Sequence, residues 1–161
     1  MQRYGGFWIR VLAYIIDSII LQFVSTILMM VFFGVGFGLS GMASGGGNEA
    51  AISIGLVIFY LATFVISWLY FALLESSSWQ GTVGKKGLGL IVTDEDGEQI
   101  SFGRATGRYF GKIISSIIIG IGFLMVGWTQ RKQGLHDIMA GTLVHKASAP
   151  ELVRNSARIF D

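Results

Sequence analysis

Two long runs of apolar residues dominate the hydrophobic pattern of the chain. Residues 11–39 carry one charged side chain, Asp17, and residues 52–74 carry none. Each run exceeds the ~20 residues that an α-helix needs to cross the ~30 Å hydrocarbon core of a bilayer. The first run is also longer than the ~7–15-residue apolar region of a signal peptide, so we expect it to be retained. The pattern predicts two transmembrane helices in an all-α membrane protein.

A third apolar run, residues 113–130, is interrupted by three glycines and follows a stretch rich in Arg and Lys. One alternative is an ordinary third transmembrane span. The other is a re-entrant or shallow hairpin whose backbone polar groups are buried in protein. A full span would place the basic C-terminal tail outside, against the preference of Lys and Arg for the cytoplasm, but the sequence leaves both alternatives open.

The same charge rule orients the two secure runs. Arg3 and Arg10 precede the first run, Lys85 and Lys86 follow the second, and the connection between the runs has no Lys or Arg. We therefore expect a cytoplasmic N-terminus and an external loop at residues 40–48.

The segment after the second run has the pattern of a small cytoplasmic β-hairpin. In residues 90–101, "LIVT" is apolar and β-branched, "DEDG" is typical of a turn, and "EQIS" resumes. Ser101 then suits the N-cap of a helix, because its hydroxyl can accept a hydrogen bond from a free backbone amide. That helix carries Gly103, Gly107 and Gly111 at four-residue spacing, which predicts a face for close helix packing. Arg104, Arg108 and Lys112 form a parallel basic stripe that either reaches lipid headgroups or pairs with carboxylates.

Composition agrees with a membrane protein and excludes several other classes. Of 161 residues, 52% are hydrophobic and 14% are charged, so the lipid bilayer is the expected partner. The net charge of +2 is small and scattered, which argues against nucleic acid binding. There is no cysteine, and the two histidines lack metal-ligand spacing, so we expect no cofactor and no metal. The sequence shows no set of a nucleophile, a base and an orienting group, so we do not expect an enzyme.

Asp17 is the residue that most needs an explanation. A carboxylate in a membrane segment is costly and is a candidate functional group by default. Arg10 is seven residues away, about 10.5 Å along a helix, so Asp17 must find its partner in another segment. The candidates are Arg131, Lys132, His136 or a hydroxyl. Two further acids at the membrane margin, Glu75 and Asp137, join Asp17 as candidate ion-binding or proton-binding groups.

Three segments resemble one known family when they are taken in order. They are "GFWIRVLAYIIDSII", "LLESSSWQGTVGKKGLGLIVTDEDGEQISFGRATGRYFGKI" and "RKQGLHDIMAGTLVHK". Together they resemble the RDD family of small bacterial integral membrane proteins, named for an arginine and two aspartates. Arg10 and Asp17 match the first two, and Asp137 matches the second aspartate. The resemblance implies an RDD-like membrane domain over residues 1–147 of a bacterial inner-membrane protein, followed by a short surface tail, 148–161.

The resemblance leaves the function open. Transport has been suggested for the family, and cation/proton antiport has been attributed to a member. One hypothesis is therefore transport of a monovalent cation or small solute with proton coupling through Asp17. Because two or three helices can hardly enclose a pathway, this would require a homo-oligomer or a very shallow site. The alternative is a structural or accessory membrane protein whose charges hold its helices in register.

Overall fold

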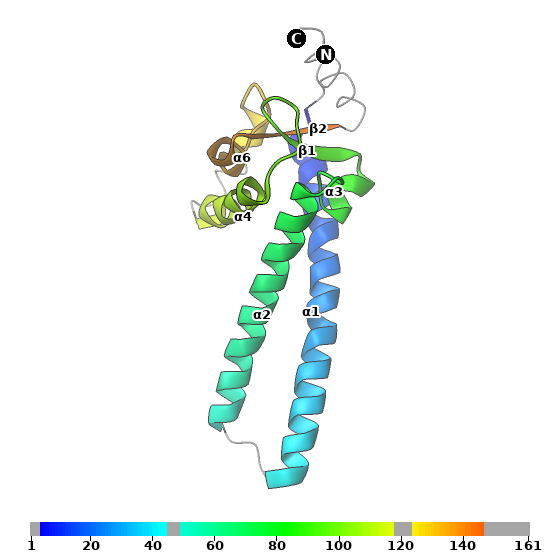
Figure 1. Cartoon of the computed structure of the whole chain (residues 1–161), viewed down its shortest axis with the longest axis vertical. Coiled ribbons are helices and arrows are strands. Elements are labelled where there is room, and N and C mark those ends of the chain that lie inside the picture. The colour runs from blue at the N-terminus through cyan, green and yellow to red at the C-terminus, as the bar shows by residue number, and fades with distance from the viewer. Residues whose placement is uncertain (1–3, 45–48, 118–123, 147–161) are drawn as a thin grey trace. The chain divides into compact units, whose positions relative to one another are not determined.

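The computed structural model describes residues 4–44, 49–117 and 124–146. Within them the chain forms α1 (Phe7–Ser44), α2 (Glu49–Ser76), α3 (Val83–Gly87), β1 (Leu90–Asp94), α4 (Phe102–Ile117), a 3₁₀ turn η1 (Met125–Gly127), α6 (Leu135–Ala140) and β2 (Thr142–Lys146) (Figure 1). The chain is divided into two compact units. The first, called the head, comprises the described residues of Met1–Asp17 and Trp68–Asp161, and the second, called the arm, those of Ser18–Ser67.

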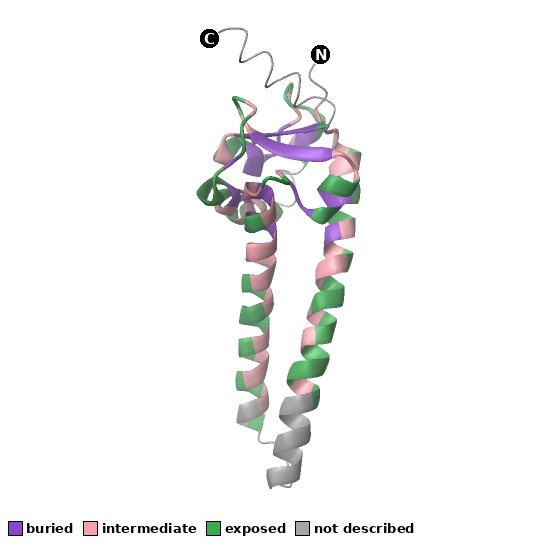
Figure 2. Cartoon of the chain, turned by 45° about the vertical axis from the view of Figure 1, so that its right-hand side comes forward, coloured by how far each residue is buried: buried purple, intermediate pink, exposed green. Residues whose placement is uncertain are grey.

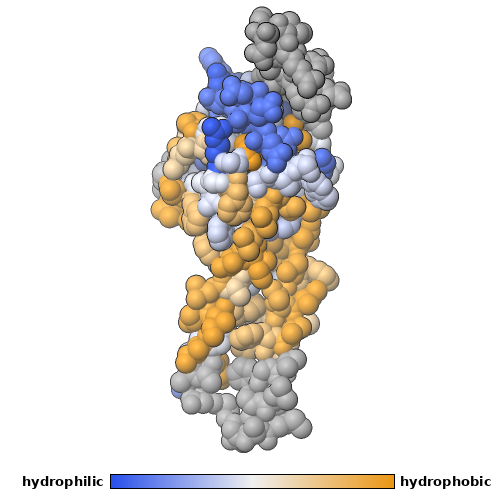
Figure 3. Space-filling model, viewed as in Figure 1, coloured by the Kyte–Doolittle hydropathy of each residue, from blue (hydrophilic) through white to orange (hydrophobic). Residues whose placement is uncertain are grey.

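The arm consists of residues 18–44 of α1 and residues 49–67 of α2. Within α1 and α2, Phe7–Gly34 and Ile52–Ser76 are long and apolar enough to cross a membrane, and they are the only such helices among the described residues. Large apolar side chains such as Phe23, Met30 and Tyr60 are mostly exposed, and orange, hydrophobic residues cover these helices in Figure 3. This outward-facing apolar surface confirms the prediction of two long apolar helices and suits contact with lipid.

The head contains the buried core of the protein. Residues coloured as buried gather around the two strands in Figure 2, and the core cluster includes Leu90, Val92, Val144 and Ala72. β1 pairs with β2 in an antiparallel two-stranded sheet, from Leu90 opposite Lys146 to Asp94 opposite Thr142. Almost every residue of both strands is buried, so each strand is covered on both faces.

This pairing corrects the predicted hairpin over residues 90–101. The turn forms as expected, since the Asp94 N–H donates to the Glu98 carbonyl at 3.0 Å and Gly97 has a positive φ of 85°. The chain after the turn does not become a strand. Glu98 and Gln99 are exposed and polar and cannot cover the apolar strand β1, whereas "TLVHK" of β2 supplies buried Leu143 and Val144. Burial decided the pairing over proximity in the sequence.

The polarity of helix α4 is the reverse of that of an ordinary amphipathic helix in a soluble protein, because its large apolar side chains are exposed. Ser101 caps it as predicted, its hydroxyl accepting from the Arg104 N–H at 3.3 Å. The buried face carries small residues and one charge, Ala105, Arg108, Gly111 and Ser115, whereas the exposed face carries large apolar side chains: Phe102, Phe110, Ile113, Ile114 and Ile117. Within its described bounds α4 has 16 residues, three of them basic, which is shorter than the ~20 apolar residues of a membrane span. Residues 118–123 of the predicted third membrane segment lie outside the described residues, as does the tail 148–161.

Only one of the three glycines predicted to pack closely does so within the chain. A Cβ on Gly111 would lie 3.1 Å from the Cα of His136, so α6 approaches the α4 backbone there. A Cβ on Gly107 would meet nothing within 4 Å, and one on Gly103 would meet only the Ser101 hydroxyl at 3.9 Å. Among the described residues of one chain, close packing is therefore seen at Gly111, and packing of Gly103 and Gly107 against another chain stays a prediction. Gly107 lies on the exposed side of α4, because the four-residue spacing drifts around the helix.

Candidate functional site: a buried charge cluster

Asp17 is held by neutral hydrogen-bond donors and by the start of a short helix. Its carboxylate accepts from the Tyr70 hydroxyl at 2.8 Å, the Thr82 hydroxyl at 2.5 Å and the Gly84 N–H at 2.8 Å. Asp17 is only 1% exposed. Since α3 begins at Val83, the carboxylate lies at a helix N-terminus, where free amides and the helix dipole favour negative charge.

The segment "GTVGKKG" is built to receive this carboxylate. Thr82 is the N-cap of α3, and Gly84 lets α3 approach α1 closely. A Cβ on Gly84 would lie 2.3 Å from the Ala13 carbonyl oxygen and 3.0 Å from the Asp17 carboxylate. Among the sequence-predicted partners of Asp17 the structure places hydroxyls, not Arg131 or Lys132. Arg131 forms an exposed ion pair with Glu95 at 3.2 Å, and Lys132 donates to the Gly127 carbonyl.

Arg108 is the centre of a second buried arrangement. It is 1% exposed and lies on the buried face of α4. Its Nε lies 3.1 Å from Glu75 Oε2, and its Nη2 lies 2.9 Å from Asp137 Oδ1. Its Nη1 donates to the Thr142 hydroxyl at 2.7 Å. One guanidinium therefore joins the end of α2, the start of α6 and β2, a use that suits its planar set of donors.

Asp137 completes a bridge to the start of α1. Arg10 Nη1 lies 2.6 Å from Asp137 Oδ2, and Arg10 Nε donates to the Gly5 carbonyl. The same carboxylate accepts from the Gly134 N–H at 3.1 Å, at the N-terminus of α6. Burial alone would raise the pKa of Asp137, but the charges of Arg108 and Arg10 and the Gly134 amide hold that pKa below its usual range. Asp137 is therefore a carboxylate at neutral pH.

Two lysines approach the other acid, Glu75. Lys85 of α3 forms a buried ion pair with Glu75, and Lys112 Nζ lies 3.4 Å from the same carboxylate oxygen. Lys112 also lies 4.2 Å from the centre of the Phe71 ring, a cation–π contact. Burial, with Lys112 and Arg108 nearby, lowers the pKa of Lys85 to about 7 despite the opposing effect of Glu75. Burial also lowers the pKa of Lys112.

His136 does not fit the role of a proton carrier near neutral pH. Its Nε2 lies 3.5 Å from Asp137 Oδ1, and its side chain is buried. Burial lowers its pKa to about 3, with Arg108 and Lys112 acting in the same direction. The imidazole is therefore neutral at pH 7. Among the described residues, no three His, Asp or Glu side chains gather as a metal site would require.

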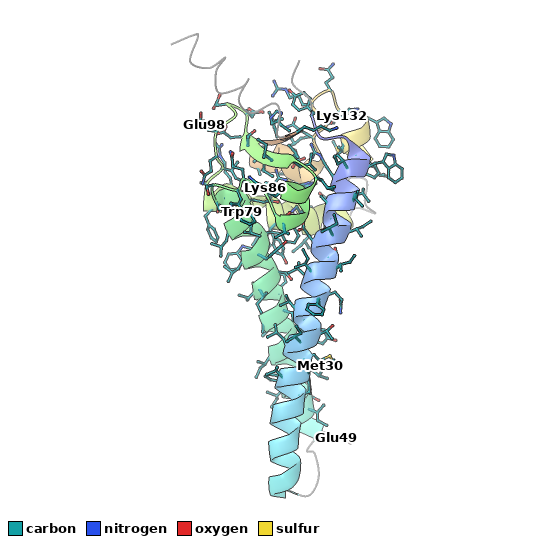
Figure 4. All side chains as sticks on the ribbon, turned by 90° about the vertical axis from the view of Figure 1, so that its right-hand side faces the viewer. Met30, Glu49, Trp79, Lys86, Glu98 and Lys132 are labelled. Carbon is teal, nitrogen blue, oxygen red and sulfur yellow. The ribbon has the colours of Figure 1, made fainter. Side chains whose placement is uncertain are left out.

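A cavity of about 160 Å³ opens beside these groups within the head. Figure 4 shows the crowding of side chains in the head around α3, which carries the labelled Lys86. The charged and polar side chains that line the cavity are Arg10, Tyr14, Asp17, Lys85, Arg108, Lys112 and His136, and the apolar ones are Phe7, Val11, Phe71, Val126 and Val144.

Sequence reasoning found Arg10, Asp17, Glu75 and Asp137 but missed most of their partners. Arg108 was noted only as part of a basic stripe, and the structure places it on the buried face of α4 with Gly111 and Ser115. Thr82 lies in a segment that resembles a phosphate-binding loop too weakly to support that function. In this segment the Thr82 hydroxyl and the Gly84 N–H instead donate hydrogen bonds to Asp17.

The sequence model of the RDD family matches residues 4–141. The chain belongs to the RDD family. Arg10, Asp17 and Asp137, the three residues that the resemblance assigned to the family's arginine and aspartates, all line or adjoin the charge cluster of this RDD protein.

Three relatives come from Bacillus subtilis (strain 168). The RDD protein is 43% identical over 150 residues to the uncharacterized protein YxaI, covering 89% of the chain and 98% of YxaI. It is 30% identical over 147 residues to the uncharacterized membrane protein YteJ (88% and 80%) and 27% identical over 153 residues to the uncharacterized protein YckC (91% and 87%). No solved structure matches. Family membership, a relative described as a membrane protein and two apolar helices identify the chain as a membrane protein.

Proposed function

We propose that this RDD protein is a structural or accessory protein of the bacterial cytoplasmic membrane, with two spanning helices and a head held together by its buried charges. The observation that supports this is the pairing of the three candidate acids. Glu75 and Asp137 are each shared by more than one cation, and Asp17 accepts three hydrogen bonds. Acids with such fixed partners hold elements in register, whereas acids that exchange cations or protons need to lose a partner during turnover.

The exposed apolar side chains of the head suit a position at the interface between the membrane and water. Trp8 and Trp128 are 79% and 76% exposed, and the outer face of α4 carries large apolar side chains. Tryptophan is enriched where membrane meets water. A helix with one apolar face can lie in the interface with that face towards the acyl chains. This arrangement would give the exposed face of α4 an apolar surrounding without a third span.

The proposed orientation places the N-terminus and the head in the cytoplasm. The support is the distribution of Lys and Arg, which is dense in the head and absent from the loop between the runs. Because the chain has no native cysteine, single-cysteine variants can test this directly. Glu98→Cys, at an exposed position of the head, should be labelled only after the membrane is opened. Asn48→Cys should react with an impermeant reagent in intact cells, and the reverse pattern would refute the orientation.

The decisive experiment for the structural role is ion flux in proteoliposomes under imposed Na⁺ and pH gradients. We expect no flux above that of empty liposomes. We also expect Asp17→Asn to lower the thermal stability of the protein, because a hydrogen-bonded charge is lost. Gradient-driven flux by the unmodified protein would refute a purely structural role.

Transport of a monovalent cation or small solute is the second candidate function. It is favoured by one observation, namely that Asp17 lines a cavity and forms no ion pair with a Lys or Arg among the described residues. In that case Asp17→Asn should abolish flux while leaving expression and assembly intact. Two spanning helices per chain enclose no pathway, so this function also entails a homo-oligomer, which the molecular mass in detergent would reveal.

A further inference from the structure

We propose that the cavity in the head binds a phosphate-type oxyanion, either the phosphate of an anionic lipid headgroup or free phosphate. This inference goes beyond the structural role proposed above and does not depend on it. It is carried by the charge of the cavity, by one unused guanidinium donor and by the size and mixed lining of the space.

The cavity lining has more positive than negative charge. Four cations, Arg10, Lys85, Arg108 and Lys112, line it, and they share only two acids, Glu75 and Asp137. The third acid, Asp17, is already stabilised by the amide and hydroxyl at the start of α3. His136 is neutral because burial lowers its pKa to about 3. Counting Asp17, the cluster carries at most one positive charge in excess, which matches the single negative charge of a phosphodiester in a lipid headgroup.

One hydrogen-bond donor among these cations has no acceptor among the described residues. Arg10 employs Nη1 for Asp137 and Nε for the Gly5 carbonyl. Its Nη2 is buried and has no hydrogen-bond partner among the described residues. A buried guanidinium nitrogen without an acceptor is unfavourable, and an oxyanion is the acceptor that arginine binds most readily. Because Arg10 lines the cavity, an anion there is well placed to supply that acceptor.

The size and the lining of the cavity favour a phosphate ester over a small halide. Its volume of about 160 Å³ is close to the ~150 Å³ of a cavity that binds benzene in another protein. Five of its lining residues are aliphatic or phenylalanine side chains, which suit the apolar part of a larger molecule. Its position beside the first turns of α1 and the end of α2 places it where headgroups are found, so we favour the lipid as the source.

Anion binding should also change the proton occupancy of the cluster. Lys85 faces Glu75, Lys112 and Arg108, and burial with those two cations lowers its pKa to about 7. A bound anion adds negative charge beside Lys85 and raises that pKa. Conversely, loss of the proton from Lys85 removes the excess positive charge. Binding of an anion that does not itself titrate should therefore weaken as the pH rises above about 7.

The test uses the full chain purified in detergent, with sulfate and inorganic phosphate as free-anion probes at constant ionic strength. Binding is followed by calorimetry and by the shift of the unfolding temperature. The lipid arm compares nanodiscs of phosphatidylglycerol and phosphatidylcholine, with bound lipid counted by native mass spectrometry. Lys112→Met removes one excess cation but leaves Glu75 paired with Lys85 and Arg108. The matched control is Arg131→Gln, which removes a cation from an exposed ion pair.

Saturable sulfate and phosphate binding that weakens at least tenfold in Lys112→Met, and stays unchanged in Arg131→Gln, supports a free anion as the occupant. Retention of phosphatidylglycerol that Lys112→Met alone reduces, without free-anion binding, supports a lipid headgroup. Absence of both kinds of binding overturns the proposal, as does an equal loss in the two variants. If Lys112→Met fails to fold, sulfate affinity of the unmodified protein decides: a decrease from pH 6.5 to pH 8.5 supports the site, and a constant affinity overturns it.

Discussion

Gly84 is the position where the smallest change to the chain should have a large effect. In Gly84→Ala the new Cβ would lie 2.3 Å from the Ala13 carbonyl oxygen and 3.0 Å from the Asp17 carboxylate. A carbon–oxygen contact needs about 3.3 Å, so α3 and α1 would have to separate by roughly 1 Å. The 2.8 Å hydrogen bond from the Gly84 N–H to Asp17 would then stretch beyond the range of a hydrogen bond.

The expected cost follows from these two effects. Overpacking costs about 1–3 kcal/mol, and a hydrogen bond to a charged group contributes about 1.5–3 kcal/mol. Alanine recovers about 0.5–1 kcal/mol through its better helix propensity. The free energy of unfolding should therefore fall by roughly 2–5 kcal/mol, a large part of the ~5–15 kcal/mol of a typical protein.

The assay is denaturation of the purified protein in one detergent, followed by circular dichroism, with Gly87→Ala as the matched control. Gly87 lies on the same short helix, is exposed, and has open space where a Cβ would stand. Gly87→Ala should therefore be neutral or slightly stabilising. If Gly84→Ala unfolds within about 1 kcal/mol of Gly87→Ala, the close approach of α3 to α1 is refuted, and with it our account of how Asp17 is held.

Three further predictions concern the head. Glu75→Gln should lower the free energy of unfolding by roughly 3–5 kcal/mol, since it leaves buried cations without their acid; an unchanged denaturation midpoint would contradict the buried pairing. Gly111→Leu should lower the melting temperature in detergent because α6 lies against its backbone, whereas Gly107→Leu should be tolerated; equal melting temperatures would refute this contrast. The pKa of Lys85 is about 7 in the folded chain and about 10.5 ordinarily, so the unfolded chain binds more protons between these values and stability should rise with pH from about 7 to about 10. Lys85→Met should flatten this rise in pH-dependent melting curves, and an unchanged slope would show that Lys85 is not its source.

The parts of the fold that sequence predicted correctly depend on local physics. The two apolar helices follow from run length, and the cap at Ser101 and the turn at residues 94–97 follow from the residue types in place. The predicted hairpin was wrong because a strand with two buried faces takes whichever partner buries it best. That partner, β2, begins 48 residues after the end of β1, and nothing in the local pattern identifies it.

The candidate site was predictable in its members and not in its pairing. The family resemblance identified Arg10 and Asp137 as candidate site residues. They are 127 residues apart, so their contact could not be predicted from their spacing in the sequence. Asp17 was expected to need a partner from another segment, and a hydroxyl was among the candidates. Its third hydrogen-bond donor is the backbone N–H of Gly84, which a pattern of side chains cannot predict. The inward position of Arg108 depends on which face of α4 meets α6, a tertiary choice that the basic stripe left open.

The ion pair between Arg10 and Asp137 also fixes an order of events during biosynthesis. Arg10 leaves the ribosome 127 residues before its partner, a delay of roughly 6–25 s at typical rates of synthesis. Both apolar runs are completed within that interval, while Arg10 still lacks Asp137. Insertion therefore comes first and closure of the head comes last, when "LHDIMAGTLVHK" is finally synthesised. A nascent chain arrested before residue 135 should be inserted in the membrane yet remain open to proteolysis in the segment that becomes the head.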